Sequence, residues 1–237
     1  MKQGDDNWLK ERERHAITWS NAGTVCGVGY ETRQLYMKRK LKLVPEKPLN
    51  WAMSEGIKRE PYAAELYYRI MHFCGYNIRF IMDAFKEDPQ DKRIGGSVDR
   101  IVEDLDSGEK WILEIKTNPG KEMRTAVPIT HNLQMHGLCH TYGLNKAHYF
   151  CWSSGQGSYL AEVTWEPVLW HRVYEWYAEF ADQWERQEIP KGLKGTEKEA
   201  RAEFIWRHTN VGEVANVLEK RLLRAQQEMQ EAHIDSY

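Results

Sequence analysis

The spacing of hydrophobic residues changes along the chain and divides it into predicted helices and strands. Apolar residues recur at helical intervals across 51–74, where Pro61 can kink the helix, and again across 130–143 and 166–186. Short runs rich in β-branched and aromatic residues predict strands at 77–82, 93–103, 111–117, 146–153 and 158–165. We also expect helices within residues 6–40, with Ser20 and Asn21 as an N-cap, and a final helix over 211–233.

This order of elements predicts an α/β fold with a central mixed sheet flanked by helices. The turn-forming stretch 104–109 separates two predicted strands, which therefore pair as an antiparallel hairpin. The polar, Gly- and Lys-containing stretch 187–200 is typical of a linker or long loop. We expect one catalytic domain over residues 1–190, followed over 191–237 by a linker and a C-terminal helix that contacts other chains or a partner.

Composition adds a few limits to this picture. Hydrophobic residues make up 41% of the 237 residues and aromatic residues 12%, enough for one packed domain. No apolar run approaches the ~20 residues that cross a membrane, and the start resembles no secretory signal, so we expect a protein of the cytoplasm (the host-cell cytoplasm if it is viral) with no membrane contact. The four cysteines form no CxxC pair, which excludes the usual zinc ribbons and iron–sulfur clusters. The net charge of −2 restricts any contact with nucleic acid to a local basic patch.

The strand 111–117 carries the most informative polar residues. Its side chains alternate, so Glu114 and Lys116 share one face with Ile112, while Trp111, Leu113 and Ile115 lie on the other. Charged groups in a strand with apolar neighbours on both faces need a partner or a ligand. The hairpin brings Asp99 beside Glu114, because each lies seven or eight residues from the turn.

Two carboxylates and a lysine are the groups that metal-dependent phosphodiester hydrolysis requires. Asp99, Glu114 and the Ile115 carbonyl can hold Mg²⁺, or Mn²⁺ in its place, while Lys116 positions or deprotonates the attacking water. A second metal ion needs another acid, and Glu60 is the best placed. The alternative is an exposed Glu-x-Lys pair without catalytic meaning, against which Asp99 and the room left by Gly95 and Gly96 argue.

Five short motifs, in order over residues 3–152, resemble the phage lambda exonuclease-like (YqaJ-type viral recombinase) family of PD-(D/E)XK nucleases. They are an opening with Trp8, Arg12, Thr18 and Ser20; a helix with Gly56 and Glu60; the strands GSVD and EIKT; a helix bearing Gln134; and the strand AHYFCW. Val98 and Arg100 stand where the family usually has proline and glycine. One extra residue between Trp8 and Ser20 leaves Arg14 as an alternative to Arg12.

The resemblance implies a restriction-endonuclease-like core and a Mg²⁺-dependent exonuclease. Such an enzyme degrades linear double-stranded DNA, with 5′ to 3′ polarity, and leaves 3′ single-stranded tails for recombination. It further implies that Arg12 (or Arg14), Thr18 and Ser20 bind the 5′-terminal phosphate, and that Gln134 lies beside Lys116 in the active site. A ring-shaped homotrimer and a single-strand annealing protein as partner are implied in the same way. The alternatives are a restriction-like or structure-specific endonuclease, and a non-catalytic DNA-binding recombination protein.

Three further features have a plain and a functional interpretation. His136 and His140 have the spacing of a zinc pair, but the helix lacks the glutamate of an HExxH motif, and core or groove histidines are the plainer explanation. Lys38, Arg39, Lys40 and Lys42 are either DNA backbone contacts or a solvated face. Leu218, Leu222, Ala225, Met229 and Ala232 form an apolar seam, which is either an interface or the docking face of a helix on its own domain.

Overall fold

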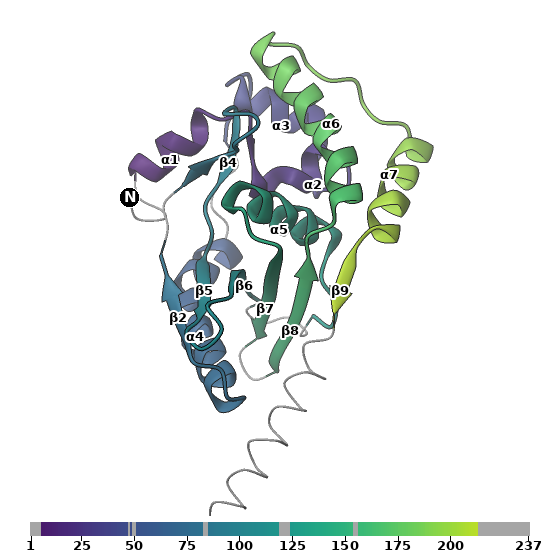
Figure 1. Cartoon of the computed structure of the whole chain (residues 1–237). Coiled ribbons are helices and arrows are strands. Elements are labelled where there is room, and N and C mark those ends of the chain that lie inside the picture. Colours follow the sequence, from purple (N-terminus) through teal and green to yellow (C-terminus); the bar gives the residue numbers. More distant parts are fainter. Residues whose placement is uncertain are drawn as a thin grey trace, which may run out of the picture.

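A six-stranded mixed sheet forms the centre of the protein (Figure 1). The computed structural model describes residues 6–46, 48, 51–82, 85–118, 124–153 and 156–212. The strand order is β2 (Ile78–Ile81), β5 (Arg100–Asp104), β6 (Lys110–Thr117), β7 (Lys146–Ser153), β8 (Gly157–Thr164) and β9 (Asn210–Gly212). Only β6 and β7 pair in parallel; the other neighbours are antiparallel. The predicted α/β class with a mixed sheet and an antiparallel hairpin is confirmed.

Helices cover both faces of this sheet. The helices of the described chain are α1 (Asp6–Glu13), α2 (Ala22–Val25), α3 (Arg33–Lys40), α4 (Trp51–Phe73), α5 (Ile129–Tyr142), α6 (Pro167–Glu185) and α7 (Gly195–Arg207), with a 3₁₀ turn η1 (Trp19–Asn21). α4 lies on one face, and α5 with α2 and α6 packed around it lies on the other. A parallel β6–β7 pair needs a crossover connection, and α5 belongs to it. The three long helices predicted from apolar spacing are confirmed, and α4 runs through Pro61 without ending.

The alternation of side chains along β6 divides the core in two. Trp111, Leu113 and Ile115 pack in one cluster with residues of α4, whereas Ile112 packs in the other with residues of α2, α5 and α6. All five residues from Trp111 to Ile115 are buried. This strand therefore lies in the middle of the fold with both faces covered, as its sequence predicts.

The predicted strand 93–103 is wrong in one respect, because the chain breaks it in two. Its first part, β4 (Ile94–Gly96), belongs to a separate small sheet between β1 (Ile17–Thr18) and β3 (Lys86–Glu87). The second part is β5, on the large sheet. The intervening residues 97–99 carry the chain from one sheet to the other, and this leaves Asp99 at the end of β5 instead of within a continuous strand.

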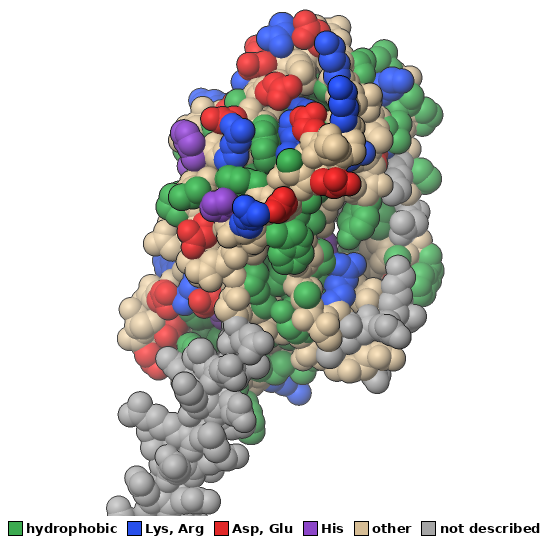
Figure 2. All heavy atoms as spheres, turned by 90° about the vertical axis from the view of Figure 1, so that its right-hand side faces the viewer, with side chains coloured by type: hydrophobic (Ala, Val, Ile, Leu, Met, Phe, Trp, Pro, Cys, Tyr) green, Lys and Arg blue, Asp and Glu red, His purple; other side chains and the backbone are tan. Residues whose placement is uncertain are grey.

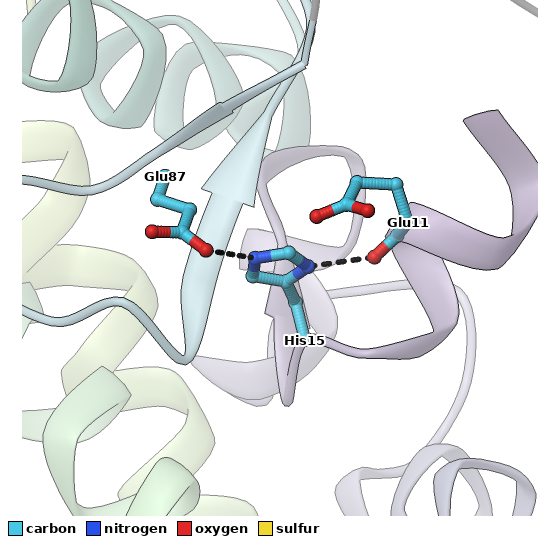
Figure 3. Close-up of side chains that lie close together, drawn as sticks. All are labelled: Glu11, His15 and Glu87. Carbon is cyan, nitrogen blue, oxygen red and sulfur yellow. Dashed lines mark hydrogen bonds and ion pairs between the residues drawn. The ribbon is translucent and has the colours of Figure 1, made fainter. Parts of the chain in front are cut away.

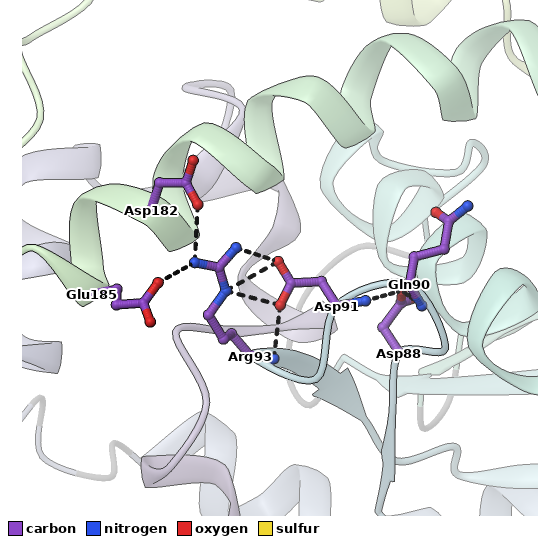
Figure 4. Close-up of polar contacts among 6 residues, drawn as sticks. All are labelled: Asp88, Gln90, Asp91, Arg93, Asp182 and Glu185. Atoms are coloured by element: carbon purple, nitrogen blue, oxygen red, sulfur yellow. Dashed lines mark hydrogen bonds and ion pairs between the residues drawn. The ribbon is translucent and has the colours of Figure 1, made fainter.

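The turn between β3 and β4 is held against α6 by Arg93 (Figure 4). The Arg93 guanidinium binds Asp91 in its own turn, at 2.6 Å, and reaches Asp182 and Glu185 on α6 at 2.9 and 2.7 Å. Asp88, which is buried, accepts backbone hydrogen bonds from Gln90 and Asp91 and closes the turn. These contacts fix the small sheet relative to the rest of the protein.

Trp19 joins the N-terminal segment to α5. Its indole is 1% exposed and donates a hydrogen bond to Thr141 Oγ1 at 2.8 Å. It also lies on Gly137, where an added Cβ would be 2.2 Å from the ring. Only glycine allows this approach, so Trp19 seats the turn that contains Thr18 and Ser20 directly on the helix that carries Gln134.

The predicted linker 187–200 is wrong in its second half. Gly195 begins α7, whose Ile205 is buried in the core, and β9 then pairs with β8 as the last strand of the large sheet. The boundary after residue 190 remains a prediction. The apolar seam from Leu218 to Ala232 and most of the predicted helix 211–233 lie outside the described residues.

Two surface observations complete the fold. On the coloured part of the face formed by α6 and α7, acidic and basic side chains are interspersed (Figure 2), so this face offers no continuous basic track. Within the described part of the chain, none of the helices is both long and apolar enough to span a membrane.

Candidate active site

Asp99 reaches across the end of the hairpin to β6. The register pairs Arg100 with Leu113, so the next position down brings Asp99 level with Glu114, as the hairpin predicted. Asp99 Oδ2 accepts a hydrogen bond from the Ile115 backbone N–H at 2.7 Å. Because the N–H and C=O of one strand residue point to the same side, the Ile115 carbonyl also lies on the side of the strand that Asp99 occupies.

Glu114 is the most buried acid of the site, at 1% exposure. Its Oε1 accepts a hydrogen bond from Gln134 Nε2 at 2.8 Å and contacts the Lys116 ammonium. Its Oε2 is buried and has no hydrogen-bond partner among the described residues. Burial, with a contribution from Asp99, raises the pKa of Glu114 to about 7, although Lys116 and Gln134 oppose the shift. A buried carboxylate oxygen without a donor is a good ligand for a cation.

Lys116 is surrounded by acids. Burial alone would lower its pKa, but Glu114, Asp99 and Glu60 outweigh burial and raise the pKa above its usual value. In the absence of other cations the ammonium is therefore charged at neutral pH. In this state it can donate hydrogen bonds to a water or a phosphate oxygen, but it cannot accept a proton.

Glu60 on α4 faces the same group of charges. Burial and the nearby Asp99 raise its pKa, while Arg100 opposes the shift. Arg100 Nη1 donates to Glu60 Oε1 at 3.1 Å and also contacts the Asp99 carbonyl. From the sequence, Arg100 was noted only as a departure from the family motif. Its contacts with Glu60 and Asp99 make it a member of the candidate site.

α5 contributes a second polar residue near Lys116. His131 lies one helical turn before Gln134 and forms a 3.2 Å hydrogen bond between its Nδ1 and the Tyr149 hydroxyl. Burial, followed by the charges of Lys116 and Arg124, lowers its pKa to about 2, so the ring is neutral. Nothing in the sequence separates His131 from the other histidines of this helix.

The zinc pair considered for α5 does not form. His136 uses Nδ1 on the Asn132 carbonyl at 3.0 Å and Nε2 on the Glu166 N–H at 3.3 Å. His140 instead stacks on Trp170 and faces Asp88. His136 is a buried core histidine and His140 a partly buried one at the edge of the core, which agrees with the plainer interpretation.

A second polar group gathers Arg12, Thr18 and Ser20. Arg12 Nη2 donates to Ser20 Oγ at 2.8 Å and to Thr18 Oγ1 at 3.4 Å, and the two hydroxyls are 3.2 Å apart. The extra residue in this stretch does not displace Arg12 from the group. Arg14 is exposed and bound to Glu11 at 3.2 Å, so the structure does not bring it to Thr18 and Ser20.

Lys40 brings a second positive charge to Arg12. Its Nζ donates to the Arg12 carbonyl at 3.0 Å, at the C-terminal end of α1, where cations are favoured by the helix dipole. Burial and the charge of Arg12 lower the pKa of Lys40 to about 8, and burial lowers the pKa of Arg12. Of the other basic residues predicted here, Arg39 binds Glu31 and Lys42 binds Glu13. An anion bound beside Arg12 and Lys40 would stabilise both charges.

Comparisons with known proteins agree with this fold. One similar solved structure is an alkaline exonuclease (LHK-Exo) from Laribacter hongkongensis. It is 17% identical in sequence, its TM-score is 0.61, and the match covers 86% of this chain and 99% of that chain. The same exonuclease in complex with dAMP gives a TM-score of 0.60 at 17% identity, and the match covers 77% of this chain and 94% of that chain. A phage-related exonuclease from Haemophilus somnus 129PT gives a TM-score of 0.50 at 10% identity, and the match covers 82% of this chain and 99% of that chain. No curated protein matches the chain.

Sequence comparison with protein families then gives a more specific assignment. The model of the YqaJ-like viral recombinase domain matches residues 7–152, more than half of the chain. The chain belongs to the YqaJ-like viral recombinase family, as the five motifs predicted. The matched residues include Arg12, Asp99, Glu114, Lys116 and Gln134.

Proposed function

We propose that this protein is a divalent-metal-dependent exonuclease that digests linear double-stranded DNA with 5′ to 3′ polarity. The observation that carries the proposal is the convergence of Asp99, Glu114 and Lys116, with a buried oxygen on Glu114 that has no hydrogen-bond partner in the described part of the chain. The family and the exonuclease fold of the solved neighbours support it. Removal of one strand would leave 3′ single-stranded tails, the substrate of recombination.

The donor set of the site suits Mg²⁺, and Mn²⁺ in its place. Asp99, Glu114 and the Ile115 carbonyl supply hard oxygen ligands, which these ions prefer. A bound divalent ion would polarise the scissile phosphate and a water. Gln134 holds the Glu114 carboxylate in its orientation, and Lys116 donates hydrogen bonds to the attacking water or to the phosphate.

A single metal ion is sufficient in this site. Glu60 was the predicted ligand for a second ion, but Arg100 already neutralises it at 3.1 Å. We propose that the Arg100 guanidinium supplies the second positive charge beside the phosphate. Because a guanidinium stays charged at all working pH values, this charge does not depend on metal concentration.

Arg12, Thr18 and Ser20 are proposed to hold the 5′-terminal phosphate. An arginine with two neighbouring hydroxyls offers several donors to a phosphate, and Lys40 adds charge. A group of residues that binds a chain end favours an exonuclease over an enzyme that cuts within a strand. A homotrimer, a single-strand annealing partner and action in the cytoplasm remain proposals from the family resemblance.

One assay tests the polarity and the mode of cleavage together. Linear and covalently closed duplexes of one sequence, with a label at either end, are incubated with Mg²⁺ or with EDTA. We expect loss of the 5′ label first, intact circles, and no cleavage in EDTA. Digestion of closed circles would contradict the proposal and favour the endonuclease; no cleavage of either substrate would favour a non-catalytic DNA-binding protein.

A further inference from the structure

Outside the proposed active site, one histidine and two glutamates meet where α1 contacts the small sheet (Figure 3). They are Glu11 on α1, His15 just after it, and Glu87 on β3. One ligand atom from each lies within 4.8 Å of the other two. This is the only group of three such residues at this spacing in the described part of the chain.

The hydrogen bond at Nδ1 of His15 directs the other ring nitrogen, Nε2, toward the two glutamates. The imidazole is 2% exposed, and Nδ1 lies 2.7 Å from the Glu11 carbonyl oxygen, which can only accept a hydrogen bond. Nδ1 therefore carries a proton, and in the neutral form of the ring Nε2 presents a lone pair. A histidine anchored in this way through one nitrogen has the usual arrangement of a metal ligand.

The lone pair of Nε2 faces a carboxylate. Nε2 is 3.6 Å from Glu87 Oε1, beyond a good hydrogen bond. The Glu11 carboxylate adds a second negative group to the same space (Figure 3). With the ring neutral, these three acceptors repel one another unless a cation lies between them. The 3.6 Å separation is also close to that of two ligands each about 2.0–2.2 Å from one ion.

We propose that Glu11, His15 and Glu87 bind a divalent transition-metal ion of the Zn²⁺ class. An imidazole with two carboxylates is a borderline donor set, which selects such ions over Mg²⁺. The ion joins α1 to β3 and so fixes the helix that carries Arg12. Arg14, bound to Glu11 at 3.2 Å, is the competing cation of the site.

The experiment uses the full chain with Asp99→Ala, so that the proposed catalytic centre lacks one ligand. After chelator treatment, Zn²⁺ binding is measured by calorimetry and the melting temperature with and without Zn²⁺. Co²⁺ replaces Zn²⁺ for visible absorption, because a site with an imidazole and few ligands absorbs more strongly than an octahedral oxygen site. We expect one equivalent of Zn²⁺ and a rise in melting temperature.

Two substitutions should move the affinity in opposite directions. Glu87→Gln, at a half-exposed position, should weaken Zn²⁺ binding at least about tenfold, since even indirect supports of a metal site cost that much. Arg14→Ala should tighten it a few-fold by removing the competing charge. Glu175→Gln, another exposed acid bound to an arginine but with both partners on α6, is the matched control and should change nothing.

Three results would overturn the proposal. One is Zn²⁺ binding that Glu87→Gln leaves unchanged, and another is no uptake at all by the Asp99→Ala protein. The third is an ion pair between His15 and Glu87 that forms as the pH falls, together with no metal binding. In that case a proton on His15, and not a metal ion, supplies the positive charge between these side chains. Glu11→Gln gives the same test if circular dichroism shows Glu87→Gln to be misfolded. None of these measurements uses DNA, so the outcome is independent of the proposed nuclease activity.

Discussion

Replacing Gln134 by leucine should make cleavage more sensitive to acid. The substitution keeps a similar volume but removes the 2.8 Å hydrogen bond to Glu114 Oε1. A hydrogen bond to an ionised group contributes about 1.5–3 kcal/mol, against about 0.5–1.5 kcal/mol for a neutral one. The difference of roughly 1–1.5 kcal/mol is lost only by the carboxylate, so the pKa of Glu114 should rise by about one unit.

The consequence for metal binding follows from the sign of this shift. The pKa of Glu114 already stands at about 7, and the metal needs the deprotonated form. A further rise of about one unit lowers the ionised fraction near pH 7 from about a half to about a tenth. We expect an apparent Mg²⁺ affinity about fivefold weaker near pH 7 and almost normal near pH 9.

The assay is the initial rate of duplex digestion at limiting Mg²⁺, measured across this pH range. Gln183→Leu is the matched control, since Gln183 donates a similar 3.1 Å hydrogen bond to Glu179 on α6, outside the site. The control should follow the parent at every pH. A Gln134→Leu protein whose rate is reduced by the same factor at all pH values would refute this reasoning and assign Gln134 a packing role.

Four further predictions concern the other proposed roles. Asp99→Ala, Glu114→Ala and Lys116→Ala should each lower cleavage at least about a hundredfold with an unchanged circular dichroism spectrum, and near-normal turnover of Lys116→Ala would contradict the mechanism. Arg12→Ala should erase the preference for 5′-phosphorylated ends while Arg14→Ala retains it; the reverse would assign the phosphate contact to Arg14. Arg100→Gly should raise Mn²⁺ binding from one ion to two, whereas one ion in both proteins would contradict the proposed charge replacement. Deletion of residues 213–237 should leave a folded nuclease of lower oligomeric mass by light scattering, and an insoluble product would place that segment in the core.

The sequence predicted the parts of the site that depend on local rules. Strand alternation placed Glu114 and Lys116 together, and counting from the hairpin turn brought Asp99 level with Glu114. Both rules involve only neighbours along or across one hairpin. The resemblance supplied the link to Gln134 and Arg12, which are far from the strands in sequence.

The missed features depend on contacts between distant elements. Arg100 was taken as a motif departure, because its pairing with Glu60 requires α4 to lie beside β5. Lys40 lies on α3 and donates a hydrogen bond to the end of α1, which is a contact between distant elements. In the sequence, Lys40 therefore looks the same as the basic residues beside it. The second half of the stretch 187–200 looked like a linker because α7 buries few apolar residues, although the run of Glu, Lys, Ala and Arg from residue 197 to 202 has high helix propensity.

The seating of Trp19 on Gly137 has a consequence for the spacing between the two polar groups of the site. Thr18 and Ser20 flank this indole, and Gln134 lies one turn from Gly137 on the same helix. In the proposed reaction, this contact therefore fixes the spacing between the residues that hold a DNA end and the residues that cut the bond. This spacing is set by close packing in the core, since the contact between Trp19 and Gly137 leaves no space for even one methyl group. A larger residue at position 137 would therefore move Thr18 and Ser20 relative to Gln134 without replacing any proposed catalytic group.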